Sequence, residues 1–187
     1  MVDFGSDGIY LNQAYEGTAP GLWRLDLRTG QLTQILGSDR VVDAIQGSAA
    51  WVTDIDPAAR AATSQEAGGP VPNRLSRLDL KTGILTHWFT FPDALPEVIG
   101  YDVNGNPVVA AVGQTGTDVW LTRSPGQATR IASYAGVGLT PPLRDSAIGD
   151  SHGVWIGAPD GVYLYGPDGY RRIAATAHWA AIGSSCV

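Results

Sequence analysis

One strand–turn–strand pattern occurs four times along this chain of 187 residues. The clearest copies, residues 22–33 and 75–86, share the sequence Leu-Asp-Leu, a basic residue and Thr-Gly. Looser copies occupy residues 119–129 and 161–173. The turn glycines are 53, 43 and 43 residues apart, and they are Gly30, Gly83, Gly126 and Gly169. A pattern that returns at this spacing restricts the chain to a repeat architecture, in which each repeat is one supersecondary unit.

A second pattern, a small residue, Ile, any residue, then small or polar residues, recurs between these hairpins. It occupies residues 43–48, 146–151 and 180–185, with a looser copy at 97–102. Most copies precede an apolar segment that reads as a further strand. Each unit therefore has four strands, which we name A to D in chain order. Four strands at roughly 40 to 50 residues are typical of a β-propeller blade. We predict an all-β fold of about four antiparallel blades, in which the small strand A residues line a narrow channel.

The best-defined copy is the stretch from Gly153 to Ala174. Aromatic and β-branched residues at 153–157, 162–165 and 170–174 favour strands, and Asp-Gly and Pro-Asp favour tight turns between them. Its Trp155-Ile156-Gly157, followed by Gly161-Val162 and Tyr165, resembles the repeat of the two-component-regulator type of β-propeller. The other copies resemble the wider class that includes YVTN-like and quinoprotein-like propellers. These resemblances imply a fold and say little about chemistry.

The repeats divide a single predicted domain, 1–187, into consecutive blades. We place them at 1–40, 41–92, 93–139 and 140–176, with a fifth copy of strand A at 177–187. Three interpretations of this arrangement remain open: a fragment of a larger ring, a half that pairs with a second copy, or a small ring that closes alone. The first two are favoured, because open terminal blades expose strand edges and apolar faces.

The charge and composition of the chain limit the classes of partner that it is expected to bind. The net charge is −6 and the pI about 4.8, and an acidic surface disfavours nucleic acid. No stretch is apolar for long enough to span a membrane. Cys186 is the only cysteine, which excludes a disulfide within the chain. One lysine against eleven arginines suggests a bacterial source. No signal peptide is recognisable, and an extracytoplasmic location is favoured over the cytoplasm by a narrow margin.

Aspartates in or beside the strand A copies are the one constellation that points to chemistry: Asp43, Asp102, Asp145 and Asp150. Strands A converge in a propeller, so these carboxylates are candidates to hold Ca²⁺ or Mg²⁺ through oxygen ligands. The alternative interpretation is that they cap turns, as aspartate commonly does. Motifs of known hydrolases, nucleotide-binding loops and zinc sites are lacking in the sequence.

The long connections all fall on one side of the predicted blades. They are residues 54–73, 90–96 and 133–142, which are B–C or D–A connections, whereas the A–B and C–D turns are short. Long loops on a rigid scaffold often carry function. The candidate ligand-facing residues on this side are Tyr15, Phe91, Tyr134, His178 and Trp179, with Phe89 beside them.

We therefore expect a non-catalytic recognition module that binds a protein, peptide or carbohydrate through its long-loop side. One alternative is a propeller-type hydrolase or lyase with a metal held by the channel carboxylates. Another is a structural domain that self-associates, with a homodimer completing the ring.

Overall fold

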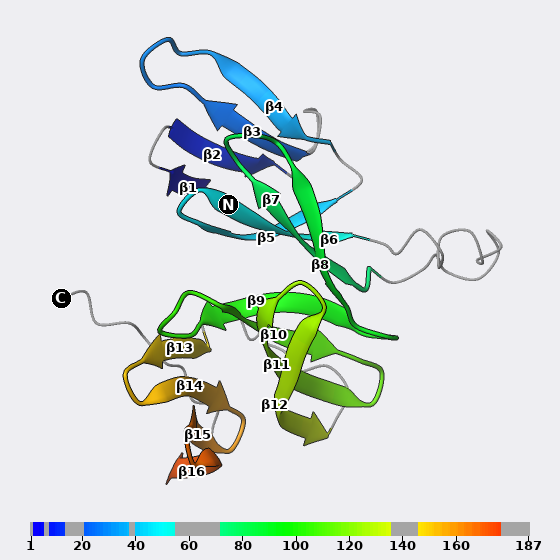
Figure 1. Cartoon of the computed structure of the whole chain (residues 1–187), viewed down its shortest axis with the longest axis vertical. Helices are drawn as coiled ribbons and strands as arrows, with labels where there is room; N and C mark the ends of the chain where they lie inside the picture. The colour runs from blue at the N-terminus through cyan, green and yellow to red at the C-terminus, as the bar shows by residue number, and fades with distance from the viewer. Residues whose placement is uncertain are drawn as a thin grey trace, which may run out of the picture. The chain divides into compact units, whose positions relative to one another are not determined.

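The computed structural model describes residues 2–5, 8–13, 21–37, 40–54, 72–135 and 146–176 (Figure 1). The regular elements of these segments are β-strands, arranged in four antiparallel four-stranded sheets. In each sheet the strands are neighbours in chain order, so every sheet is an up-and-down meander. This is the architecture of a propeller blade, and the all-β propeller prediction is confirmed.

The chain divides into two compact units, residues 1–90 and 91–187. The first unit contains two blades. The strands of the first blade are β1 (Val2–Gly5), β2 (Gly8–Gln13), β3 (Gly21–Leu25) and β4 (Leu32–Leu36). Those of the second blade are β5 (Val41–Gln46), β6 (Ala49–Asp54), β7 (Arg74–Asp79) and β8 (Leu85–Thr90).

The second unit also contains two blades. The strands of the third blade are β9 (Leu95–Tyr101), β10 (Pro107–Val112), β11 (Gly116–Ser124) and β12 (Gln127–Ala135). Those of the fourth are β13 (Ala147–Asp150), β14 (Gly153–Ala158), β15 (Gly161–Gly166) and β16 (Gly169–Ala175). The strands predicted within the stretch from Gly153 to Ala174 are β14, β15 and β16.

Side chains that alternate along the strands form one core between the two blades of each unit. In the first unit, Tyr10 and Leu22 of the first blade cluster with Val52 and Leu78 of the second, and each is at most 1% exposed. In the second unit, Val119 and Leu121 of the third blade cluster with Val154 and Ile156 of the fourth, and each is at most 2% exposed. Burial of these faces is the main favourable contribution to the packing of neighbouring blades.

Glycines allow the strands A of the second unit to lie backbone against backbone. A methyl group on Gly149 of β13 would overlap the backbone of Asp102, and one on Gly100 of β9 would overlap the backbone of Ala147. Gly100 and Gly149 are therefore required by the close approach of the third and fourth blades.

The C–D turns of the first two blades are built by the repeated Asp and Gly. The Asp26 carboxylate accepts hydrogen bonds from the backbone N–H groups of Arg28 and Thr29, at 2.8 and 3.0 Å. Asp79 accepts the equivalent bonds from Lys81 and Thr82, at 3.0 and 2.9 Å. Gly30 and Gly83 both have a φ of +70°, a left-handed conformation that glycine adopts without strain.

Candidate cleft between the third and fourth blades

A cleft of about 320 Å³ opens between the third and fourth blades, within the second unit. It is bordered by the A–B turns after β9 and β13 and by the C–D turns after β11 and β15. In a meander these turns lie at the same end of the strands, which we call the short-turn side. The lining residues are Asp102, Val103, Asn104, Leu121, Arg123, Asp150, Ser151, His152, Gly153, Val154, Tyr165, Gly166 and Pro167.

Asp102 lines the cleft and organises the A–B turn of the third blade. Its carboxylate Oδ1 accepts the backbone N–H groups of Asn104 and Asn106, at 2.9 and 2.8 Å. The Asn106 side-chain amide donates to Oδ2 at 2.8 Å. Both carboxylate oxygens are thus engaged by the turn itself.

Asp150 has the equivalent position in the fourth blade. Its Oδ1 accepts the His152 backbone N–H at 2.8 Å, and its Oδ2 is 3.2 Å from His152 Nδ1. Desolvation is the largest single influence on the Asp150 carboxyl and raises its pKa. Hydrogen bonds from the His152 backbone, the Trp155 side chain and the His152 ring outweigh this effect and hold the pKa below its usual value. Asp150 is therefore an anion at neutral pH, fixed beside the cleft.

The structure brings two of the four predicted metal ligands, Asp102 and Asp150, to the same cleft. Asp43 is buried in β5 of the first unit, and Asp145 lies outside the described residues. Within the described segments, no three His, Cys, Asp or Glu side chains come together as a metal-binding group. Asp102 and Asp150 both accept hydrogen bonds from the backbone of their turns, as the turn-capping alternative expects. A calcium or magnesium site remains a prediction.

The remaining cleft residues combine an apolar floor with a polar rim. Leu121 and Val154 are each 2% exposed and belong to the core between the blades. Tyr165 contributes a partly exposed aromatic ring. Arg123 and His152 are exposed and add a cation and an imidazole. A cleft that offers an aromatic ring, donors and acceptors at fixed positions suits a small polar ligand.

Phe91 and Tyr134, two of the predicted ligand-facing residues, have different environments. Phe91 is only 2% exposed, and its ring packs edge-on against Trp120 with centroids 6.1 Å apart. It is a core residue, which corrects its prediction as a surface aromatic: an apolar ring next to a strand gains more from burial than from exposure. Tyr134 is partly exposed. Tyr15, His178 and Trp179 lie outside the described residues.

Tyr134 belongs to a tyrosine cluster at the seam between the third and fourth blades. Its hydroxyl lies 2.5 Å from the hydroxyl of Tyr170, and Tyr170 stacks on Tyr163 with centroids 4.9 Å apart. Burial raises the pKa of Tyr134. Tyr163 donates to Asp160 Oδ2 at 2.8 Å, and this bond raises the pKa of Tyr163. All three rings remain neutral phenols at physiological pH and tie β12 to β15 and β16.

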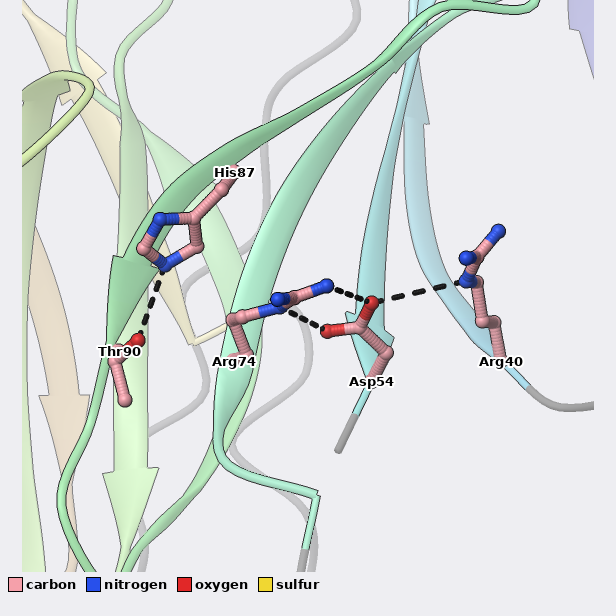
Figure 2. Close-up of polar contacts among 5 residues, drawn as sticks. All are labelled: Arg40, Asp54, Arg74, His87 and Thr90. Atoms are coloured by element: carbon pink, nitrogen blue, oxygen red, sulfur yellow. Dashed lines mark hydrogen bonds and ion pairs between the residues drawn. The ribbon is translucent and has the colours of Figure 1, made fainter. Parts of the chain in front are cut away.

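The first unit has a charged cluster at the base of the long B–C connection (Figure 2). Asp54 at the end of β6 forms two hydrogen bonds of 2.8 Å with Arg74 at the start of β7, and lies 3.7 Å from Arg40. Asp54 is only 5% exposed. In β8 the exposed His87 ring lies 3.0 Å from the Thr90 hydroxyl. Asp54 therefore fixes both ends of the connection whose residues 55–71 the structure does not describe.

Sequence reasoning missed Arg123, His152 and Tyr165 as neighbours in one cleft. Arg123 lies near the end of β11, His152 lies in the A–B turn after β13, and Tyr165 lies near the end of β15. A meander places these turns on one side of their blades, so the signal was available from the repeat. The sequence drew attention instead to the long connections on the opposite side.

The fold places this chain in the β-propeller class. No protein-family model and no curated protein matches the sequence. A solved protein described provisionally as a gluconolactonase is 20% identical over 85% of this chain and 58% of its own, with a TM-score of 0.39. The N-terminal domain of Nup159 is 13% identical over 97% of this chain and 47% of its own, with a TM-score of 0.43. The chain thus spans about half the length of these proteins, and its fold assignment rests on its own four sheets.

None of the described residues forms a helix with the length and apolar character needed to cross a membrane.

Proposed function

We propose that the chain is a non-catalytic recognition module that binds a carbohydrate in the cleft between the third and fourth blades. The observation that carries this proposal is the lining of the cleft. An aromatic ring, a guanidinium, an imidazole and an amide surround a volume of about 320 Å³. Sugars are recognised by polar groups that bind their hydroxyls and by aromatic rings that contact their C–H faces.

The polar groups of the cleft are well positioned for such a ligand. Hydrogen bonds within the A–B turns hold Asp102 and Asp150 in place, so little conformational entropy is lost when a ligand binds beside them. The sequence predicted a ligand on the long-loop side of the blades, whereas this proposal places the ligand on the short-turn side. Residues 55–71 and 136–145 of those loops lie outside the described structure.

A glycan array probed with the purified chain tests the proposal, followed by calorimetric titration of any sugar bound. Arg123→Ala is expected to weaken binding at least about tenfold, since a hydrogen bond from a charged donor contributes about 1.5–3 kcal/mol. Arg130→Ala is the matched control, because Arg130 is exposed on β12 and does not line the cleft. Binding of no array sugar, or equal binding by both variants, would overturn the proposal.

A metal-dependent hydrolase or lyase is the second candidate, favoured by the presence of Asp102 and Asp150 in one cleft. It predicts a calcium-dependent rise in the melting temperature that chelator reverses and Asp150→Asn abolishes. The recognition function predicts no change on adding calcium or chelator. Thermal unfolding of the wild type and the variant, with and without calcium, separates the two.

A further inference from the structure

The tyrosine cluster at the seam between the third and fourth blades lies apart from the cleft. Tyr134 belongs to β12 of the third blade, and Tyr163 and Tyr170 belong to β15 and β16 of the fourth. None of these three tyrosines is among the residues that line the cleft. Each of them is partly exposed, so a small oxidant in solution has access to the cluster.

The hydroxyls of Tyr134 and Tyr170 are in direct contact across the seam. Their oxygens lie 2.5 Å apart and share a hydrogen bond, at the short end of the range for two hydroxyls. An ortho carbon of a tyrosine ring is two bonds from the hydroxyl oxygen. The hydrogen bond therefore holds ortho carbons of the two rings near one another, and these are the carbons at which two tyrosyl radicals couple.

The third ring supplies a path for an electron and a proton. Tyr163 stacks on Tyr170 with ring planes 4° apart and centroids 4.9 Å apart, and its hydroxyl donates to Asp160 Oδ2 at 2.8 Å. A phenol that loses an electron becomes a strong acid, so a carboxylate that already accepts its proton favours oxidation of Tyr163. Tyr170 then passes an electron through the stacked contact to the Tyr163 radical. Tyr163 recovers its proton from Asp160, and the phenolic proton of Tyr170 is released to water.

We propose that the Tyr134–Tyr170 pair is a site of oxidative cross-linking that joins the third and fourth blades by a covalent bond. The oxidant is hydrogen peroxide acting through a peroxidase. One peroxide takes two electrons and two protons from the two phenols and is reduced to two molecules of water. The resulting radicals form one bond between their ortho carbons. The hydrogen on each of those carbons then leaves as a proton, and each phenol oxygen regains one, so the chain loses two hydrogen atoms in total.

The bond would close a loop between residues that are 36 positions apart. Such a closure reduces the entropy of the unfolded chain, as a disulfide does. The cross-linked chain is therefore expected to melt about 5 °C or more above the untreated chain. The inference is independent of the carbohydrate proposal, because it requires no ligand in the cleft.

Treatment of the purified chain with hydrogen peroxide and a peroxidase tests the proposal, at a protein concentration low enough to disfavour coupling between chains. Dityrosine fluorescence follows the reaction, and mass spectrometry of the digested chain locates the bond. The wild type is expected to remain a single chain, to lose two hydrogen atoms and to yield one pair of linked peptides, which contain Tyr134 and Tyr170. Tyr134→Phe and Tyr170→Phe are each expected to lose this product completely.

Tyr165→Phe is the matched control. Tyr165 lies opposite Tyr170 in the β15–β16 pair but has no place in the cluster, so this variant is expected to form the same product as the wild type. Tyr163→Phe keeps both coupling hydroxyls and removes the proton path, so the same product is expected to form more slowly.

A bond between other tyrosines, cross-links only between separate chains, or the same product from Tyr170→Phe would overturn the proposal. Formation of the product by Tyr163→Phe at the wild-type rate would overturn the path through Asp160. An oxidised wild type that melts no higher than oxidised Tyr170→Phe would overturn the stabilising effect of the bond.

Discussion

Asp54 illustrates how one buried carboxylate organises a strand pair. It is 5% exposed and bonds bidentately to Arg74, which is itself only 21% exposed. A buried ion pair contributes little compared with an apolar replacement of both partners, but removal of one partner leaves the other charge desolvated. A single substitution of Asp54 is therefore expected to reduce stability more than the substitution of a carboxylate in an exposed ion pair.

We expect Asp54→Asn to lower the free energy of unfolding by about 1–3 kcal/mol, since the Arg74 guanidinium loses its counter-charge. Urea unfolding measures the loss. The same substitution at Asp118 is the control: its partner Arg130 lies 3.4 Å away and is 59% exposed, and such pairs contribute at most about 1 kcal/mol. Equal losses at the two sites would show that the burial of Asp54 has no energetic consequence.

In the C–D turns of the first two blades, the protonation state of an aspartate is linked to the hydrogen bonds that form the turn. Backbone N–H donors, Thr29 first for Asp26 and Thr82 first for Asp79, lower the pKa of both carboxyls below 3.8. A folded-state pKa below the unfolded value means that folding favours the carboxylate. The contribution to stability is complete above about pH 5, where both states are ionised, and is lost as the pH falls through the folded-state pKa.

The double variant Asp26→Asn/Asp79→Asn keeps an acceptor at each turn but removes the titration. Its melting temperature is expected to fall less between pH 5 and about pH 2.5 than that of the wild type. Asp168→Asn, in the C–D turn of the fourth blade, removes one exposed charge as a control. An unchanged acid dependence in the double variant would contradict the role of these two carboxylates.

Strand A is the element in which side-chain volume is most restricted. Gly149→Ala would push a methyl group into the backbone of Asp102. We expect a loss of about 1–3 kcal/mol, the usual cost of overpacking. Gly126→Asn is a suitable control, because a Cβ at Gly126 meets open space and asparagine tolerates its φ of +76°. Urea unfolding that ranked the control below Gly149→Ala in stability would contradict this account.

At the scale of the whole molecule, the sequence was sufficient to predict the blades but not the cleft. The blades were predictable because their signals are local: Asp79 and Gly83 define a turn within a few residues, and alternation defines the strands beside it. The cleft depends on Arg123 and His152 from different blades, whose proximity is set by packing across the seam. The burial of Phe91 was missed because its partner Trp120, in β11, is distant in the sequence and meets Phe91 only through tertiary packing.

Association and stability are linked if two chains complete a ring, and this gives a prediction for the intact protein. Unfolding of a dimer to separate chains shifts with concentration by mass action. For two chains of 187 residues, a tenfold rise in protein concentration is expected to raise the melting temperature by about 2 °C. Scanning calorimetry over a concentration series measures this shift, and a melting temperature independent of concentration would show that the blades are stable without a second copy.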